Sequence, residues 1–324
     1  MLYSAPSLDE ADERLIGNID RLCEKLAGRA KTAQTWTGVL ARQAFSRSRG
    51  GSSANGAQPS AVGAADPEPA DPDGEDWPAL QGYRRAMDYA IRRAGAQSFS
   101  YSIEFIHALH FMLTEHGRTR HSGSFRSEGI QVLDVEGKVV YLAPPADRVP
   151  ALMHELVEGL NGSTGESPWV RAAMAHLNML RIHPFHDGNG RMARCLQNLV
   201  LMHASANALE VASLEEYAGR HMKSYNVALR STGDTWEPHR DTTAWIRFCL
   251  EAHYAQAIAL FTKVSELERL EDDLREHLAN RHALPDVTLQ SLGKVFGARP
   301  AVVGRWWRMR PERVLEHLIA ETQD

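Results

Sequence analysis

The chain has 324 residues, of which 43% are hydrophobic and 24% charged, and its formal net charge is −5. This composition is typical of a soluble globular protein, and the length suits either one large domain or one domain with smaller attachments. The negative balance provides no overall basic field that would attract nucleic acid or an anionic membrane. Because no apolar run reaches membrane-span length and the first residues lack a secretory signal, we expect a cytoplasmic protein.

Three cysteines, Cys23, Cys195 and Cys249, lie far apart in apolar surroundings. A sparse, odd set is typical of reduced thiols in a cytoplasmic protein. We therefore predict that all three are small buried residues and that none is a nucleophile or a metal ligand.

The N-terminal region, residues 1–50, shows a helical period. Ser7 is the predicted cap of a helix over residues 7–26, and a second helix is predicted over residues 35–45. Composition then changes: residues 46–76 are rich in Gly, Ser, Ala, Pro and Asp without an apolar period. Residues 51–76 are therefore predicted to be a flexible insertion.

The central region, residues 77–255, is predicted to be an all-α core with one small hairpin. Amphipathic or apolar helical patterns cover residues 77–94, 102–116, 150–161, 168–182, 192–204, 214–231 and 242–270. Between them, residues 129–145 contain two β-prone segments around Glu136-Gly137 and end at two prolines, which indicates a β-hairpin.

The C-terminal region, residues 256–324, contains two short helical patterns within residues 287–309, around a turn at Gly297–Pro300. This arrangement is compatible with a helix-turn-helix, and several arginines lie nearby. Trp306 and Trp307 are as well explained by packing as by a recognition surface. A DNA-binding regulator is therefore an alternative function, although nucleic acid is not the favoured partner.

The sequence HPFHDGNGR, which begins at His183, follows an apolar helical segment directly. Gly188-Asn189-Gly190 tolerates positive φ and leaves backbone N–H groups uncovered at the start of the next helix, which is a favourable place for an anion. Arg191 and Arg194 on the first turns of that helix can add bonds to phosphate oxygens. The pattern predicts a phosphate site.

Two further residues of this segment point to catalysis. Asp187 would repel a polyphosphate unless a cation lies between them, and Mg²⁺ held by one carboxylate and substrate phosphates is the usual solution. His183 titrates near neutrality and could remove a proton from an attacking hydroxyl. Each residue has an ordinary structural explanation, but their combination predicts transfer from a nucleotide phosphate.

The segment HPFHDGNGRMAR, residues 183–194, resembles the signature of the Fic family, His-x-Phe-x-Asp/Glu-Gly-Asn-Gly-Arg-x-x-Arg, at all eight specified positions. We call it the signature segment. The resemblance extends over roughly residues 77–255 and includes a hairpin, called the flap in that family. It implies a Fic-type helical core and transfer of AMP from ATP to a Ser, Thr or Tyr hydroxyl of a target protein.

The resemblance also implies roles for individual residues. His183 would be the general base, Phe185 a core anchor, and Asp187 the ligand of Mg²⁺. The backbone of Gly188, Asn189 and Gly190 would hold phosphates, with Arg191 at the β-phosphate and Arg194 at the γ-phosphate. Relatives with Lys in place of Gly190 are linked to phosphorylation, so the glycine favours adenylyl transfer. Tyr225 would line the adenine pocket, or else be an ordinary core aromatic.

The expected partners are ATP and a protein substrate that pairs with the hairpin around residues 132–142 as an added strand. Self-modification and a homodimer are further expectations. Within the same fold, transfer of UMP or phosphocholine, or removal of AMP from a modified protein, are alternative reactions.

Many Fic proteins carry an inhibitory helix with the pattern Ser/Thr-x-x-x-Glu-Gly/Asn, whose glutamate pairs with the second signature arginine. The literal match at Ser124–Gly129 lies in the approach to the hairpin, where the family shows Gly-x-x-Arg. Ser46 and Gly50 fit the pattern after the second helix, with glycine in the place of glutamate. Either this motif has lost its acid, or the segment only begins the insertion.

Overall fold

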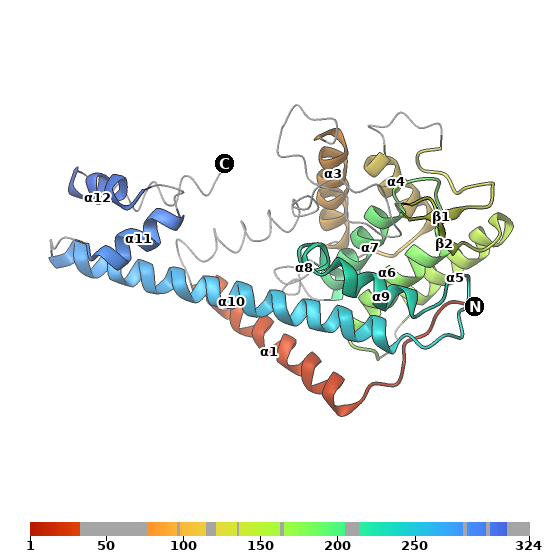
Figure 1. Cartoon of the computed structure of the whole chain (residues 1–324), viewed down its shortest axis with the longest axis horizontal. Helices are drawn as coiled ribbons and strands as arrows, with labels where there is room; N and C mark the ends of the chain where they lie inside the picture. Colours follow the sequence, from red (N-terminus) through yellow and green to blue (C-terminus); the bar gives the residue numbers. More distant parts are fainter. Residues whose placement is uncertain are drawn as a thin grey trace. The chain divides into compact units, whose positions relative to one another are not determined.

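A computed structural model describes residues 1–32, 77–95, 98–114, 121–134, 136–162, 165–204, 214–280, 284–295 and 299–309 (Figure 1). The predicted helix over residues 35–45, the insertion at 51–76, and the regulatory candidates Ser46 and Gly50 lie outside the described residues. Control by a carboxylate at position 50 therefore stays a prediction.

The described part of the chain is helical apart from one two-stranded hairpin, which confirms the predicted all-α class. The chain divides into two compact units. The first comprises residues 1–21 and 47–256, and the second comprises residues 22–46 and 257–324. The signature segment lies in the first unit.

Helix α1, Glu10–Thr32, begins three residues after the predicted cap. Asp9 Oδ1 accepts the backbone N–H groups of Ala11 and Asp12, at 2.8 and 2.9 Å, and the Asp9 N–H donates to Asp12 Oδ2 at 3.2 Å. This reciprocal pattern is a capping box, worth about 1 kcal/mol to the helix. The prediction of Ser7 as cap was wrong because the competing Asp9–Asp12 pair satisfies the first N–H groups.

The core of the first unit is built on α6, Pro168–Ile182, and α7, Asn189–Ala204, which pack against each other on either side of the signature loop (Figure 1). Nearly every side chain of both helices is buried. The apolar pattern predicted this for α7, whereas residues 168–182 were expected to form an amphipathic helix with one exposed face. Around them lie α3, Trp77–Ala94; α4, Ile103–Thr114; and α5, Val149–Asn161. The signature segment thus connects two largely buried helices, which hold both of its ends in place.

The remaining helices of this unit follow the core. They are α8, Leu214–Arg220; α9, Met222–Arg230; and the first part of α10, Thr243–Asn280. Trp245 on α10 is buried and donates its indole N–H to the Ala173 carbonyl of α6 at 2.8 Å. This bond ties α10 to the central helix.

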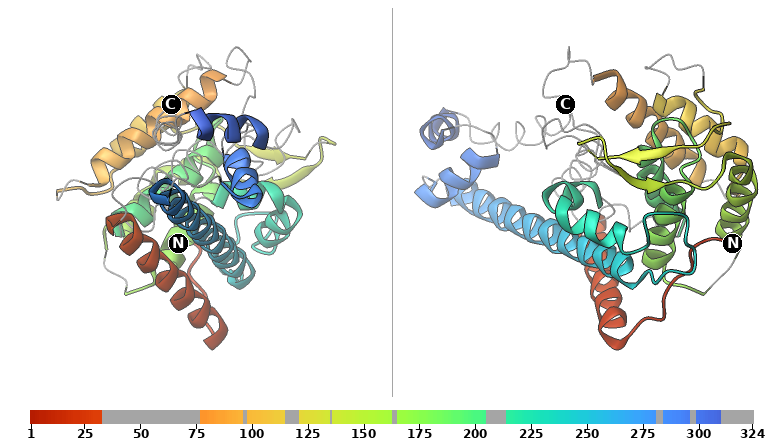
Figure 2. Two further views of the ribbon diagram at one scale, coloured as in Figure 1. Left: turned by 90° about the vertical axis from the view of Figure 1, so that its left-hand side faces the viewer. Right: turned by 45° about the vertical axis from the view of Figure 1, so that its right-hand side comes forward.

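The predicted hairpin forms from β1, Gln131–Leu133, and β2, Val139–Leu142, which are antiparallel (Figure 2). Val132 pairs with Tyr141, and an irregularity follows, after which Leu133 pairs with Val139. Tyr141 is buried and its hydroxyl donates to the Arg181 carbonyl of α6 at 2.6 Å, so the hairpin is anchored next to the end of that helix. The short helix η3, Ala146–Arg148, leads on to α5.

The second unit contains the later turns of α1 and α10 together with α11, Asp286–Val295, and α12, Pro300–Met309. The Arg29 guanidinium lies 4.2 Å from the Phe261 ring centroid and donates to Ser265 Oγ at 2.7 Å. Helices α11 and α12 pack together, as the predicted helical pair requires. Recognition of DNA by this pair stays an alternative prediction.

All three cysteines are free and buried, which confirms their predicted burial. Within the described ranges, no helix combines the length and the apolar character needed to cross a membrane.

Candidate active site

His183 terminates α6 in a left-handed backbone conformation, with φ 49° and ψ 58°. It is the one non-glycine residue with positive φ among the residues that the structure describes. Such a conformation costs about 1–2 kcal/mol for an L-residue other than glycine, so the surroundings must hold it. The turn redirects the chain from α6 into the signature loop and presents the imidazole at its start.

The His183 side chain is half-buried, and its Nδ1 lies 3.3 Å from the Leu180 carbonyl oxygen. A carbonyl only accepts hydrogen bonds, so Nδ1 carries the proton and Nε2 keeps its lone pair. Burial lowers the pKa of His183 to about 4. At neutral pH the imidazole is therefore neutral and able to accept a proton at Nε2.

Arg126, which lies between α4 and the hairpin in the sequence, contacts the C-terminal end of α6. Its Nε donates to the His183 carbonyl at 2.8 Å, and its backbone N–H donates to the Pro184 carbonyl at 2.9 Å. A cation next to the C-terminus of a helix also interacts favourably with the carbonyl dipoles there. Arg126 is thus one of the groups that hold the left-handed turn.

Hydrogen bonds between Phe185 and Asn189 stabilise the signature loop. The Asn189 side chain accepts the Phe185 N–H at 3.0 Å and donates to the Phe185 carbonyl at 2.9 Å. Phe185 is fully buried, which matches its predicted role as an anchor. The Asn189 amide is therefore engaged within the loop, and what Asn189 offers a phosphate is its backbone.

His110 on α4 braces the other side of the loop. Its ring stacks on Phe185 at 3.6 Å between centroids and 4° between planes. Its Nε2 donates to the Asp187 carbonyl at 2.9 Å, while its Nδ1 accepts the Gly123 N–H at 2.9 Å. Burial lowers the pKa of His110 to about 4, which agrees with a neutral ring that both donates and accepts.

Gly188 lies directly against this brace. Its φ is +72°, and a Cβ atom at this position would lie 2.9 Å from Thr114 Cγ2. Any side chain would therefore combine an unfavourable backbone with a steric clash. The glycine of the motif is required by the packing of α4 against the loop.

Helix α7 begins at Asn189, and its first intrahelical hydrogen bond runs from Met192 N to Gly188 O at 2.9 Å. The N–H groups of the first turn precede this bond, so the positive end of the helix dipole faces the loop. Arg191 is buried and lies 3.5 Å from Asp187 Oδ2, with a second bond of 3.0 Å to the Leu113 carbonyl. The structure thus places Asp187, Arg191 and the start of α7 together, as the motif predicted.

Arg194 and Tyr225 lie deeper. Arg194 is buried one turn further along α7. Burial raises the pKa of Tyr225, and the nearby charge of Arg194 opposes part of that rise. Tyr225 packs in the core against Trp245 and Phe248, and its hydroxyl lies 3.3 Å from His176 Nε2. The structure gives Tyr225 a packing role, and contact with adenine stays a prediction.

His176 centres a buried polar network behind the loop. Its Nδ1 lies 2.6 Å from Gln197 Oε1, and Gln197 Nε2 lies 3.1 Å from His253 Nε2. Since Nδ1 donates to the amide oxygen and Nε2 accepts from Tyr225, the imidazole is neutral. Burial lowers the pKa of His176 to about 3.

The free energy of unfolding should therefore fall on mild acidification. Below about pH 6.5, the ordinary pKa of a histidine, His176 binds a proton in the unfolded chain but stays neutral in the folded chain. The loss grows as the pH falls from about 6.5 toward 3, and reaches about 2 kcal/mol at pH 5 for this group. His110 and His183 act in the same direction between pH 6.5 and 4.

Urea unfolding at pH 7.5, 6 and 5 measures this dependence, with His176→Gln as the matched variant. In the variant, the free energy of unfolding should depend less steeply on pH, because it lacks one imidazole that stays neutral in the folded protein. An identical slope in parent and variant would contradict the assignment.

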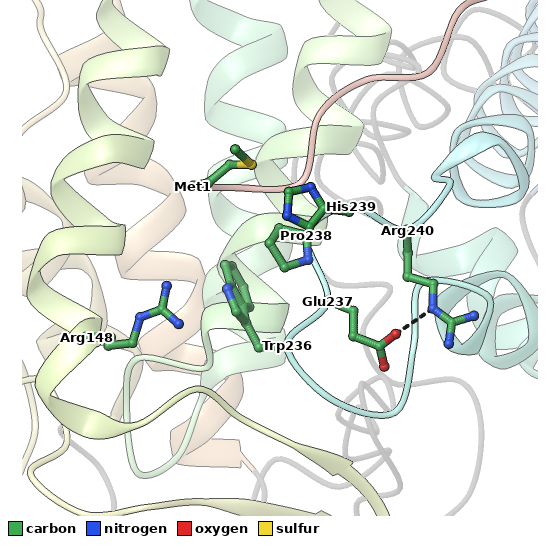
Figure 3. A pocket seen from close by; sticks show the side chains of 7 residues that line it. All are labelled: Met1, Arg148, Trp236, Glu237, Pro238, His239 and Arg240. Carbon is green, nitrogen blue, oxygen red and sulfur yellow. Dashed lines mark hydrogen bonds and ion pairs between the residues drawn. The ribbon is translucent and has the colours of Figure 1, made fainter.

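A pocket of about 560 Å³ lies elsewhere in the first unit (Figure 3). Met1, Arg148 and residues 236–240 line it, and Glu237 is paired with Arg240 at 2.6 Å. No predicted site residue is among them. The pocket is therefore separate from the signature loop.

Two residues of the site were not predicted from the sequence, His110 and Arg126. His110 sits in an apolar helical pattern, where a single histidine is more often a core residue. Arg126 is the last residue of the Gly-x-x-Arg pattern, but nothing local indicates that it reaches the end of a helix 57 positions away.

Comparison with known proteins agrees with this geometry. The model of the Fic/DOC family matches residues 100–201, which contain α4, the hairpin, the signature segment and most of α7. A Fic family protein from Desulfovibrio desulfuricans G20 superimposes with a TM-score of 0.63 at 25% identity, covering 81% of this chain and 77% of that one. The Fic-1 structure from C. elegans, with a TM-score of 0.52 at 17% identity, covers 79% of this chain and 73% of its own and shows the fold alone.

Curated relatives are named protein adenylyltransferase Fic. The one from Drosophila virilis is 26% identical over 225 residues, 66% of this chain and 44% of the relative. The one from Drosophila willistoni is 32% identical over 123 residues, 36% of this chain and 24% of the relative. The matches thus span less than half the length of these two relatives. With the signature segment, the helical core and the hairpin in place, residues 100–201 form a Fic/DOC domain.

Proposed function

We propose that this protein is a Mg²⁺-dependent protein adenylyltransferase, which transfers AMP from ATP to a Ser, Thr or Tyr hydroxyl of a target protein. The observation that supports it most is the placement of a neutral imidazole, His183, just before a loop that ends at the positive end of α7. A proton acceptor and a phosphate-binding helix terminus are the two parts that nucleotidyl transfer needs. The names of the curated relatives point to the same reaction.

In the proposed step, His183 Nε2 removes the proton of the target hydroxyl. The hydroxyl oxygen attacks the α-phosphorus of ATP, and the bond from that phosphorus to the bridging oxygen of the β-phosphate breaks. AMP is then joined to the target and pyrophosphate leaves, with the proton on His183. The depressed pKa of His183 keeps it unprotonated at neutral pH, ready for the first event.

The phosphates would lie against the start of α7. The N–H groups of Asn189 and Gly190 and the guanidinium groups of Arg191 and Arg194 would supply positive charge to oxygens that gain negative charge in the transition state. Gly190 is half-buried and carries no side chain that could reorient the nucleotide. We therefore favour transfer of the adenylyl group over transfer of the γ-phosphoryl group.

Asp187 fits a magnesium ion that arrives with the nucleotide. Its side chain is 69% exposed, Oδ1 accepts the Gly188 N–H at 2.6 Å, and Oδ2 faces Arg191. Over the described residues, no cluster of three or more metal-binding side chains forms. Asp187 would supply a hard oxygen ligand to the ion. When bound, the ion would neutralise phosphate charge.

The exposed edge of β1 fits the docking of an extended target segment. The Leu142 N–H donates to the Asp234 carbonyl at 2.9 Å, so the outer edge of β2 is already occupied. The Ala143 N–H donates to Ile130 O, and the Asp134 N–H donates to Lys138 O. In an antiparallel ladder this alternation turns the backbone groups of Gln131 and Leu133 away from β2, toward the open edge.

The outer edge of β1 should therefore bind the target through its backbone. Replacing Gln131 with proline removes an outward N–H but no bond between β1 and β2, and edge strands tolerate proline. We expect the KM for a peptide target to rise about tenfold, because a lost backbone bond and a steric block both oppose pairing. Steady-state transfer to a peptide substrate measures this, with Gln131→Ala as the control that keeps the N–H. Equal KM values for the two variants would contradict docking at this edge.

The nucleotide itself is tested by incubating the purified protein in a cell lysate with labelled ATP, UTP or CDP-choline. The proposal expects protein labelling from ATP only. Labelling from UTP or CDP-choline instead would assign the same fold to a different transferred group.

A further inference from the structure

The side chain of Arg126, which is 3% exposed, contacts both the base of the hairpin and the end of α6. Its Nη1 donates to the Glu128 carbonyl at 2.7 Å, just before β1, and its Nη2 donates to the Pro144 carbonyl at 2.5 Å, just after β2. Its Nε donates to the His183 carbonyl at 2.8 Å, and Nη2 also lies 3.4 Å from the Ile182 carbonyl. One guanidinium therefore spans both ends of the hairpin and the backbone of the proposed base.

This arrangement uses the cation in an unusual way. Within the described part of the chain, Arg126 makes no ion pair, and its charge is met by backbone carbonyl oxygens. Burial lowers the pKa of Arg126, although an arginine remains charged at any physiological pH. A buried cation that is solvated only by carbonyl dipoles is stable only while those carbonyls converge on it. The charge thus fixes the relative positions of the segments that supply them.

The carbonyl of His183 belongs to the residue whose backbone is left-handed. That conformation is not the preferred one for histidine, so it depends on contacts of this kind. Glu128 and Pro144 flank the strands on which the target segment is proposed to dock. A shift of the hairpin base would change the position of the guanidinium, and with it the peptide that carries the imidazole.

We propose that Arg126 is a positioning residue, which couples a target bound on the hairpin to the orientation of the His183 imidazole. This inference rests on the proposed function, because it concerns the same base and the same docking edge. Arg126 takes part in no bond making or breaking. Its contribution is to hold the base in line with the hydroxyl that the hairpin presents.

The test compares Arg126→Lys with the parent. Lysine keeps the charge, but its three donors radiate from one nitrogen and cannot reach separate carbonyls on both sides, as the planar fork does. We expect kcat for a peptide target to fall about 10²-fold, in line with the cost of a small misplacement of a catalytic group. Binding of a fluorescent ATP analogue with Mg²⁺ should change less than about threefold, because that affinity depends on α7.

Arg148→Lys is the matched control, since Arg148 is an exposed arginine in η3, just beyond the hairpin. Its kinetics should equal those of the parent. In Arg126→Ala, guanidinium added at a non-denaturing concentration should restore part of the lost kcat, whereas ammonium should not. Such a result would show that the planar fork, and not positive charge alone, sustains kcat.

A second readout does not depend on activity. Hydrogen exchange of the Asp134 and Ala143 amides, which bond across the hairpin, should be at least tenfold faster in Arg126→Lys, while core amides of α7 stay as protected as in the parent. If the parent transfers no AMP, the proposed function fails, and the exchange data still decide whether Arg126 holds the hairpin.

Three results would overturn the inference: an unchanged kcat in a folded Arg126→Lys protein, unchanged exchange of the hairpin amides, or a loss of nucleotide binding equal to the loss of kcat. The last would mean that the substitution disturbs the whole site rather than the coupling.

Discussion

Replacing His183 with asparagine should reduce AMP transfer by about 10²–10⁴-fold, the usual contribution of a general base. Asparagine cannot take up a proton, but it tolerates the left-handed backbone that this position requires. The variant should therefore remain folded, with a urea midpoint close to that of the parent. Incorporation of labelled AMP into the target, measured over time, gives the rate.

His183→Ala should lose the same activity and also some stability, since alanine is less suited than asparagine to positive φ. The pair of variants thus separates the loss of the base from the cost of the backbone. Transfer at the parent rate by either folded variant would show that another group removes the proton.

Replacing Asp187 with asparagine should reduce Mg²⁺-supported transfer by about 10²-fold or more, because the contribution of a metal ion to transition-state charge is several kcal/mol. Asparagine is nearly the same size, and its side-chain oxygen can still accept the Gly188 N–H, so the loop should keep its shape. Only the negative charge is lost. Transfer is measured across a range of Mg²⁺ concentrations at saturating ATP.

Asp147→Asn is the matched control, since Asp147 is an exposed carboxylate on η3 with no proposed role. It should keep the rate and the Mg²⁺ dependence of the parent. If Asp187→Asn also kept both, Asp187 would not be the ligand of the ion.

Much of this site could be predicted because its residues are neighbours in sequence. Gly188, Arg191 and Asp187 lie within one loop and one helical turn, so the helical period already places them together. The burial of α7 follows from an apolar pattern that covers nearly all its faces, and the apolar stripe of residues 168–182 predicted an amphipathic helix beside it. The hairpin was predicted from the turn residues and the β-prone segments beside them.

The residues that hold the site could not be predicted in this way, because their partners are distant in sequence. His110 contacts Asp187 from a helix 77 positions earlier, and Arg126 reaches His183 from 57 positions away. A local pattern describes a helix or a turn, but it contains no information on which loop will lie against it. The prediction of the residue that caps α1 was wrong for a different reason. Both Ser7 and Asp9 can accept the first N–H groups of the helix, and the reciprocal bonds with Asp12 favour Asp9.

In the proposed function, the protein transfers the α-phosphoryl group of ATP with its adenosine, and His183 is the base. The most direct measurement compares ATP labelled at the α-phosphate with ATP labelled at the γ-phosphate, in parallel reactions with the parent and with His183→Asn. We expect protein to be labelled from the α-position and not from the γ-position, and we expect His183→Asn to lose this label. Labelling from the γ-position, or α-labelling that survives in folded His183→Asn, would contradict it.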